Sequence, residues 1–487
     1  MKLGLFETGK YFTKFTRCFR QAGALFFFLA VSGCATYHSM PITAEAVRAR
    51  LQPPDMAQVR ILAAEIKHPI IHPIELKADE QLSPDGAAVL AVLLNPSLRA
   101  IRDQRDLSKA QLLDAGLLPN PEVTFSLDVP TGGNTAGRVN AYGLGLDWNV
   151  TSLIPRKSKV REAKARGEAV DLDIAWQEWQ VAQGAKAAFY QLSSLRSQIA
   201  LLERVRQRMA ENVAHIQKAV ADGSMTADTL NTAQAANARA NESLLELEKQ
   251  DDHQRLKLLR LLGLPPDSPV HLSKKVRLPS RVVLPKATML LDGLEQRRLD
   301  LLALRCGYDS QEAAVRAAVL EQFPRITVGP TINRDTDNVR TTGFGINIEL
   351  PIFNRHQGKI AIERATRQKL FDEYANRVFQ TRSDIEQVES GILFLNEQIA
   401  AAQASEAGLR RVEENYRRAL AEGRTDALIY YSVWNDFIDA QTKVFDLEGQ
   451  LAQALVALEL ATGFYKIPRP DQSSRAAPTE PKIEKEQ

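Results

Sequence analysis

The sequence is poor in three features that many functions depend on: cysteine, aromatic side chains and an excess of one charge. Aromatic residues make up 7% of the 487 residues, and 62 basic residues stand against 59 acidic ones. Such balanced charge argues against a nucleic-acid partner, which requires clustered Lys and Arg. The three cysteines form no Cys-x-x-Cys pair, so neither a zinc site nor a dithiol redox centre is predicted.

Motifs for catalysis are also missing. There is no HExxH, no GxSxG, no phosphate-binding Walker loop and no GxGxxG ahead of a helix. His68 and His72 lie in His-Pro-Ile-Ile-His-Pro, where the prolines favour an extended segment rather than a metal site. We therefore predict that the protein is not an enzyme and needs no cofactor and no metal.

Long apolar runs are confined to the amino terminus, and even the one found there is short. A basic stretch precedes an apolar segment of about ten residues, Ala22–Val31, which is too short to cross a bilayer as a helix. It ends in Val-Ser-Gly-Cys34, which resembles the lipobox of bacterial lipoproteins. We expect residues 1–33 to be a signal peptide and Cys34 to be the acylated first residue of an outer-membrane lipoprotein.

The chain contains an internal duplication. Glycines recur at a spacing of 200 residues, and their neighbourhoods agree, as in Gly143-Leu-Gly-Leu-Asp against Gly343-Phe-Gly-Ile-Asn. Pro121-Glu-Val-Thr-Phe similarly matches Pro324-Arg-Ile-Thr-Val at a spacing of 203. The predicted organisation is an extended leader 34–80, a first repeat 81–270, a linker 271–285, a second repeat 286–466 and a disordered tail 467–487.

Proline is absent from two stretches of more than 100 residues, between Pro155 and Pro265 and between Pro351 and Pro468. An interior proline costs a helix about 3 kcal/mol, so these stretches permit long unbroken helices. Gly223 and Gly423 divide them into pieces of roughly 65 and 40 residues, and the longer piece would reach about 100 Å. Leucines at three- and four-residue steps predict coiled-coil-like packing.

Each repeat also contains two short segments in which apolar and polar residues alternate. They are centred on Phe125, Leu146, Val328 and Ile346, and their lengths approach what a tilted membrane strand needs. Four strands leave two edges, and hydrocarbon tolerates no unpaired backbone groups. Several copies would therefore have to share their strands in one barrel; three copies would give twelve strands.

These features together resemble the TolC-like outer-membrane efflux family. Asn95-Pro96-Ser-Leu resembles the opening helix of the family, and Leu350-Pro-Ile-Phe-Asn-Arg-His-Gln-Gly358 resembles its strand-to-helix junction. The first copy departs from that junction at Thr151-Ser-Leu-Ile-Pro155. The resemblance implies a mainly α fold with a small transmembrane β part. It also implies a homotrimer with a twelve-strand barrel on a long α-helical barrel.

The resemblance further implies two periplasmic turns that contact an adaptor and narrow the channel. The candidate contact residues are Gly223, Ser224, Thr226, Gly423, Arg424 and Thr425. The candidate gate acids are Asp228, Asp426 and Asp436, which threefold symmetry would turn into rings. A carboxylate at a helix start is also stabilised by the helix dipole alone, so that interpretation stays open.

The predicted function is the outer-membrane channel of a tripartite efflux system. It would conduct metal cations or drugs passively from an inner-membrane pump, expected to be of the RND type, through a periplasmic adaptor (membrane fusion) protein. The expected partners also include outer-membrane lipid, and exclude nucleic acid. The alternatives are a lipid-anchored periplasmic coiled-coil adaptor or an envelope lipoprotein without a pore.

Overall fold

The computed structural model describes residues 35–52, 55–76 and 81–467. The lipidation candidate Cys34, the signal peptide and nearly all of the predicted tail lie outside these residues. The chain divides into two compact units, Met1–Gln52 and Pro53–Gln487, and each is described by itself.

The leader 34–80, which its prolines predict to be extended, contains two short helices. Helix α2 (Ala44–Leu51) belongs to the first unit and α3 (Met56–Ala64) to the second. Thr43 and Asp55 accept hydrogen bonds from first-turn N–H groups of these helices. Side-chain capping of this kind stabilises a helix start by about 1 kcal/mol, and α3 also buries apolar side chains against α4. The expectation of an extended segment was wrong for these residues.

The second unit has the duplicated element order that the sequence predicts. The first repeat comprises α4 (Pro84–Leu94), α5 (Pro96–Gly116), β1 (Glu122–Asp128), β2 (Ala141–Asn149), α6 (Leu153–Ala221) and α7 (Ala227–Leu262). The second comprises α8 (Ala287–Leu291), α9 (Leu294–Arg297), α10 (Leu299–Leu320), β3 (Ile326–Arg334), β4 (Arg340–Ile348), α11 (Gln357–Ala421) and α12 (Ala427–Thr462). The proline-free stretches form α6 and α11, of 69 and 65 residues, and α7 and α12, of 36 residues each.

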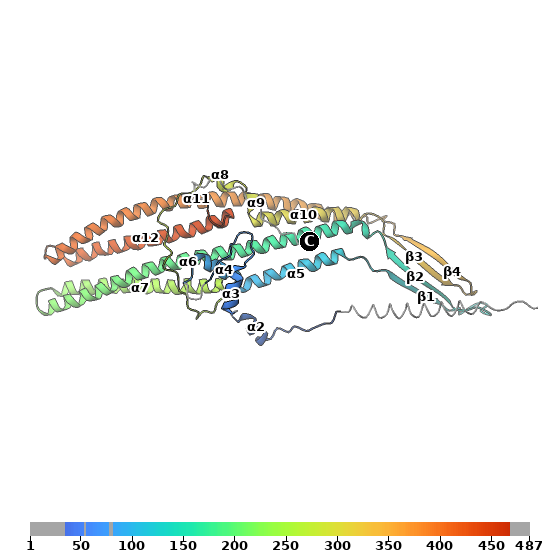
Figure 1. The fold of residues 1–487 in the computed structure, drawn as a ribbon, viewed down its shortest axis with the longest axis horizontal. Helices are drawn as coiled ribbons and strands as arrows, with labels where there is room; N and C mark the ends of the chain where they lie inside the picture. Colours follow the sequence, from blue (N-terminus) through green and yellow to red (C-terminus); the bar gives the residue numbers. More distant parts are fainter. Residues whose placement is uncertain (1–34, 53–54, 77–80, 468–487) are drawn as a thin grey trace, which may run out of the picture. The chain divides into compact units, whose positions relative to one another are not determined.

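The long helices form two hairpins. Figure 1 shows α6 paired with α7 and α11 paired with α12, with both turns at the end of this unit opposite the sheet. Helix α6 also packs against α10 and α12, which joins the two repeats. No helix among the described residues is long and apolar enough to span a membrane.

The fully buried apolar side chains of α11 form one narrow stripe. Ile385, Ile392 and Ile399 are fully buried at seven-residue intervals and pack with leucines of α12. A heptad interval keeps one face of each helix turned toward its partner, as in a coiled coil. The predicted coiled-coil-like packing is confirmed, and it leaves the other faces of α11 exposed.

The four strands form one open antiparallel sheet in the order β1-β2-β3-β4. Strand β2 pairs with β3 across the repeats, with Leu144 opposite Ile332 and Trp148 opposite Val328. Strands β1 and β4 each have a neighbour on one side only, so both are edge strands. The predicted open edges are therefore present in the single chain.

The segment between the repeats touches both of them. Leu82 and Leu272 form an isolated parallel bridge, in which the N–H of Leu82 donates to the carbonyl of His271 at 2.8 Å. Ten residues farther along, the backbone of Val282 exchanges two hydrogen bonds with the side-chain amide of Asn396 on α11, at 3.0 and 2.8 Å. This segment therefore links the first repeat to the middle of α11.

The α11 stripe gives a testable stability difference between two adjacent residues. Ile392 is fully buried, whereas Leu393 is 52% exposed. Replacing Ile392 by Ala should cost roughly 3 kcal/mol, since it removes buried methylenes and leaves a cavity. Leu393→Ala is the matched control and should cost much less. Denaturant midpoints of the purified variants would measure this, and equal midpoints would contradict the burial of the stripe.

Candidate functional site

The two helical turns predicted as contact sites have the same backbone geometry. Gly223 and Gly423 have φ values of +76° and +66°, a backbone region in which residues other than glycine are strained. In each turn the following residue, Ser224 or Arg424, donates its N–H at 2.8 Å to a carbonyl five residues earlier. Such bonds satisfy carbonyl groups left unpaired at the end of a helix.

The side chains around these turns differ between the copies. In the first turn, Ser224 donates its hydroxyl to the carbonyl of Ala219 at 2.9 Å, and Thr226 caps α7. In the second turn, Arg424 forms an ion pair with Glu422. Thr425 is half-buried, whereas the other five candidate contact residues are exposed. The surface at both turns is therefore available to a partner, but its chemistry is different in each.

The three candidate gate acids fall into separate environments. Asp426 is the N-cap of α12, where its carboxylate accepts the N–H of Leu428 at 2.9 Å. Asp228 is exposed in the first turn of α7. Asp436 is exposed on α12 ten residues beyond Asp426, or about 15 Å along the helix. A capping role accounts for Asp426, while Asp436 has no such structural explanation.

Asp439 is a candidate that sequence reasoning missed. It lies three residues after Asp436, so the two carboxylates share one face of α12. Burial raises the pKa of Asp439 above its ordinary value of 3.8, and the nearby charge of Asp436 raises it further. The Asp-x-x-Asp spacing on a helix was the signal that could have found it.

The aromatic residues near the second turn belong to the hydrophobic core. Tyr430, Tyr431 and Trp434 are at most 7% exposed and pack with α6 and α7. The hydroxyl of Tyr430 donates to the buried carboxylate of Glu413 at 3.2 Å. These contacts favour helix packing over binding of an aromatic substrate.

The two histidines of the leader are also used in packing. His68 accepts the backbone N–H groups of Ile70 and Ile71 through Nδ1, and its Nε2 lies 3.0 Å from the carbonyl of Ala175. Burial lowers the pKa of His68, which favours its neutral form. His72 packs edge-on against Tyr465. Within the described part of the chain, no three His, Cys, Asp or Glu side chains are grouped as a metal site.

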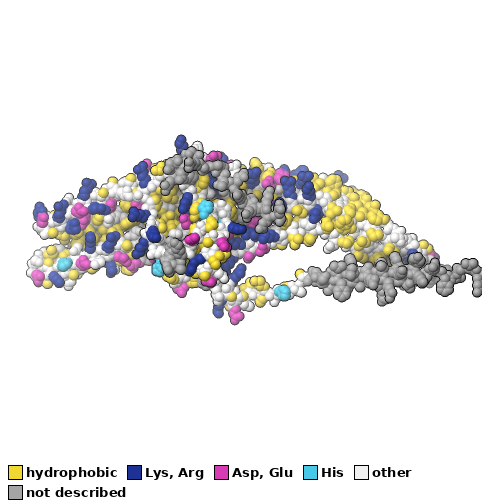
Figure 2. All heavy atoms as spheres, viewed as in Figure 1, with side chains coloured by type: hydrophobic (Ala, Val, Ile, Leu, Met, Phe, Trp, Pro, Cys, Tyr) yellow, Lys and Arg dark blue, Asp and Glu magenta, His cyan; other side chains and the backbone are white. Residues whose placement is uncertain are grey.

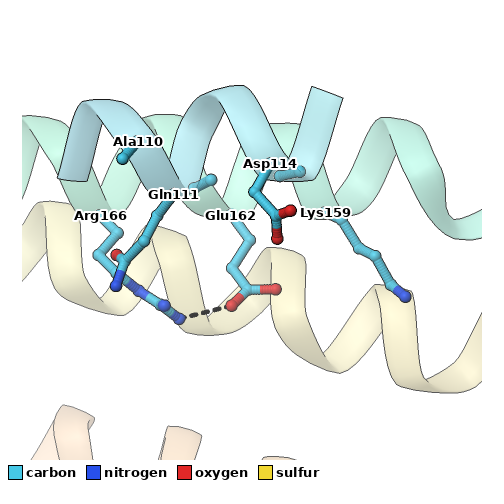
Figure 3. Close-up of a pocket in the computed structure, with 8 residues that line it drawn as sticks. Ala110, Gln111, Asp114, Lys159, Glu162 and Arg166 are labelled. Atoms are coloured by element: carbon cyan, nitrogen blue, oxygen red, sulfur yellow. Dashed lines mark hydrogen bonds and ion pairs between the residues drawn. The ribbon is translucent and has the colours of Figure 1, made fainter. Parts of the chain in front are cut away.

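A groove of about 540 Å³ lies between α5 and the start of α6 (Figure 3). Its charged side chains neutralise each other, as where Arg166 contacts Glu162 at 2.5 Å. Lys159, which also lines the groove, reaches Glu321 at the end of α10 at 2.7 Å. None of the predicted site residues lines this groove, and structural ion pairs account for three of its charged side chains, Lys159, Glu162 and Arg166.

The sheet presents one apolar and one polar face. Phe125, Phe344 and Ile346 are 68%, 66% and 62% exposed on the apolar face, and Figure 2 shows hydrophobic side chains gathered over the strands. The polar face carries small residues such as Ser126 and Gly143, which lie opposite each other. Exposed apolar surface of this extent on a sheet marks contact with a membrane or with another chain.

Comparison with known proteins finds similarity in both sequence and fold. Residues 290–464 match the model of the family described as outer membrane efflux protein. The cobalt-zinc-cadmium resistance protein CzcC of Cupriavidus metallidurans is 24% identical over 397 residues, which cover 78% of this chain and 90% of CzcC. The resemblance to the TolC-like outer-membrane efflux proteins is confirmed.

The fold of this chain is shared with solved structures of low sequence identity. The outer membrane protein VceC of Vibrio cholerae superposes with a TM-score of 0.65 at 17% identity, over 78% of this chain and 96% of VceC. CusC, described in work on transmembrane channel formation, gives a TM-score of 0.64 at 17% identity, over 82% of this chain and 97% of CusC. The mainly α fold with a small β part is therefore confirmed.

The capping role of Asp426 requires a side-chain oxygen that accepts a hydrogen bond, but it does not require a charge. Asp426→Ala should destabilise the protein by about 1 kcal/mol, because the first turn of α12 loses its cap. Asp426→Asn keeps an oxygen that can accept the same hydrogen bond, so its denaturant midpoint should stay near that of the unmodified protein. A midpoint for Asn as low as that for Ala would contradict the capping assignment.

Proposed function

We propose that three copies of this chain form a channel through the outer membrane, as the exit component of a tripartite efflux system. The observation that carries this proposal is the open four-stranded sheet, which has one exposed apolar face and two unpaired edges. A membrane-spanning sheet must close on itself, because lipid cannot hydrogen-bond to edge N–H and C=O groups. Three copies of four strands supply a closed barrel of ordinary size.

The exposed faces of α11 support association along the helical part. Phe379 and Phe394 lie off the buried stripe and are 72% and 61% exposed. Large apolar residues that recur on one long helix are unusual for a surface bathed in water. Burial against neighbouring copies would remove them from water and surround a continuous passage with helices.

The length of the helical part fits a passage into the periplasm. At 1.5 Å per residue, the 69 residues of α6 extend about 100 Å. The turns at Gly223 and Gly423 would then face a periplasmic adaptor and, through it, an inner-membrane pump. Exposed Met225, Leu428 and Ile429 next to these turns supply apolar surface for that contact.

The lipid anchor and the substrate follow from other observations. The signal segment ending at Cys34 supports acylation of that residue and attachment to the outer membrane.

For the substrate, we favour divalent metal cations over drugs, since the relative CzcC is a cobalt-zinc-cadmium resistance protein. The Asp436 and Asp439 carboxylates, tripled by symmetry, would attract cations at one level of the passage. A pump of the RND type would supply the driving force.

The channel can be tested directly with the purified full-length protein. We expect a trimer mass in detergent and discrete conductance steps in planar bilayers. A monomer that produces no conductance would instead favour the adaptor, and a trimer that produces none would favour the envelope lipoprotein without a pore. Deletion of the gene should raise sensitivity to divalent metals, and Cys34→Ala should reduce the amount of protein in the outer membrane.

The carboxylate pair gives the channel a pH dependence of predictable sign. As the pH falls, Asp439 takes up a proton above its ordinary pKa of 3.8, and the cation selectivity of the channel should fall with it. Asp436→Asn removes the charge that raises this pKa, so the midpoint of the loss should move to lower pH. Reversal potentials measured across a pH series would show the shift. Asp228→Asn is the control, and a shift as large in that variant would contradict the assignment.

A further inference from the structure

The pairing of strands across the two repeats contains information about how one copy meets the next. In the single chain, β2 of the first repeat pairs with β3 of the second. The two remaining strands, β1 and β4, form the open edges. In a closed ring of copies, β4 of one copy would meet β1 of the next, so the contact between copies also joins a second repeat to a first.

The duplication relates these two contacts, because each joins corresponding strands of a second and a first repeat. Strand β4 corresponds to β2 at a spacing of 200 residues, as the pair Gly143 and Gly343 shows. Strand β1 corresponds to β3 at a spacing of 203, as Pro121 and Pro324 show. The β2–β3 register can therefore be transposed onto β4 and β1, by adding 200 to one strand and subtracting 203 from the other.

We propose that β4 pairs antiparallel with β1 of a second copy of this chain in this transposed register. Trp148 lies opposite Val328 within the chain, which transposes to Ile348 opposite Phe125 of the partner subunit. The next pair along the strands is Asn347 with Ser126 of the partner subunit. The inference rests on the proposed trimer and adds to it the identity of the strand contacts.

The side chains that this register brings together match in character. On the apolar face it places Leu350, Ile348, Ile346 and Phe344 opposite Val123, Phe125, Leu127 and Val129 of the partner subunit. All eight are at least half exposed in the single chain. A slip of one residue would turn every apolar side chain of one strand to the polar face, so that alternative is excluded by burial.

The backbone of β4 is oriented for this contact. The N–H of Glu349 donates to the carbonyl of Arg325 on β3 at 2.9 Å. Because N–H groups alternate in direction along a strand, those of Ile348 and Leu350 point to the open edge. In the β2–β3 contact, the equivalent N–H of Val150 donates to the carbonyl of Ile326 at 3.1 Å. Leu350 is therefore placed to donate to Val123 of the partner subunit.

Apolar residues beyond the strand ends extend the same contact. Leu117 and Leu118, just before β1, are 61% and 58% exposed. Ile352 and Phe353, just after β4, are 65% and 93% exposed. Both pairs lie at the helical end of the sheet, so antiparallel pairing of β4 with β1 brings them to the same level. Contact across the boundary would remove these side chains from water.

An alternative register is shifted by two residues, which keeps the same side chains on the apolar and the polar face. The repeats do differ by such a shift elsewhere. In the first repeat, Glu122 lies opposite Asp147, and the same register in the second repeat would place Arg325 opposite Asn347. The second repeat instead pairs Ile326 with Ile348, so that Arg325 lies opposite Glu349. The experiment therefore compares three positions of β1 that share the polar face.

Cysteine cross-linking in the full-length trimer tests the register. Asn347 and Ser126 of the partner subunit would form a non-hydrogen-bonded pair, with Cα atoms about 4.5 Å apart, within the range of a disulfide. Diagonal neighbours lie roughly 7–8 Å apart and bridge poorly. Asn347→Cys is therefore combined with Ser126→Cys, and, as matched controls, with Thr124→Cys or Asp128→Cys. A bridge within one copy is excluded, because β1 and β4 are not neighbours in the sheet.

We expect the Asn347→Cys, Ser126→Cys protein to lose its monomer band on a non-reducing gel and to form covalent dimers and trimers. The two controls and the single-cysteine variants should stay largely monomeric on the same gel. Faster cross-linking of either control would overturn the register, and so would a trimer by mass that cross-links in none of the three. A monomeric mass before oxidation would instead defeat the proposed trimeric channel itself.

Discussion

The structure depends on where the backbone hydrogen bonds of four strands can be satisfied. Within the chain, β2 and β3 are paired on both sides, whereas β1 and β4 each keep one row of N–H and C=O groups without a strand neighbour. In water such edges are a risk of aggregation, and in lipid they are not tolerated. The apolar face of the same sheet adds a second demand for cover. In the proposed channel, other copies of the chain would meet both demands.

Much of this architecture could be predicted from the sequence because its signals are strong and repeated. Helix lengths follow from the absence of proline and from glycines that must adopt positive φ, such as Gly423. The strands follow from strict alternation, and the duplication allows each prediction to be checked twice. The helices α2 and α3 were not predicted, although the prolines of this segment lie outside both helices and Thr43 and Asp55 cap their first turns.

The candidate site was less predictable than the fold. Asp426 was predicted as a gate acid because it lies near a turn, but its carboxylate caps α12. Asp439 was missed although the Asp-x-x-Asp spacing places it near Asp436, because the desolvation that raises its pKa is not displayed by a linear sequence. His68 shows the same limit, since the contact of its Nε2 with the carbonyl of Ala175 depends on tertiary packing. Burial and neighbouring charge, rather than residue type, separate these roles.

The two turns have one backbone geometry and two different surfaces. One presents Ser224 and Thr226, while the other presents Arg424 beside Glu422. A ring of three such chains would offer six turns, alternating in kind around its rim. A partner that recognises side chains would find three equivalent sites there, whereas a partner that recognises only the shape of the turn would find six. The number of partner molecules bound by such a ring would therefore depend on whether the partner recognises side chains or the shape of the turn.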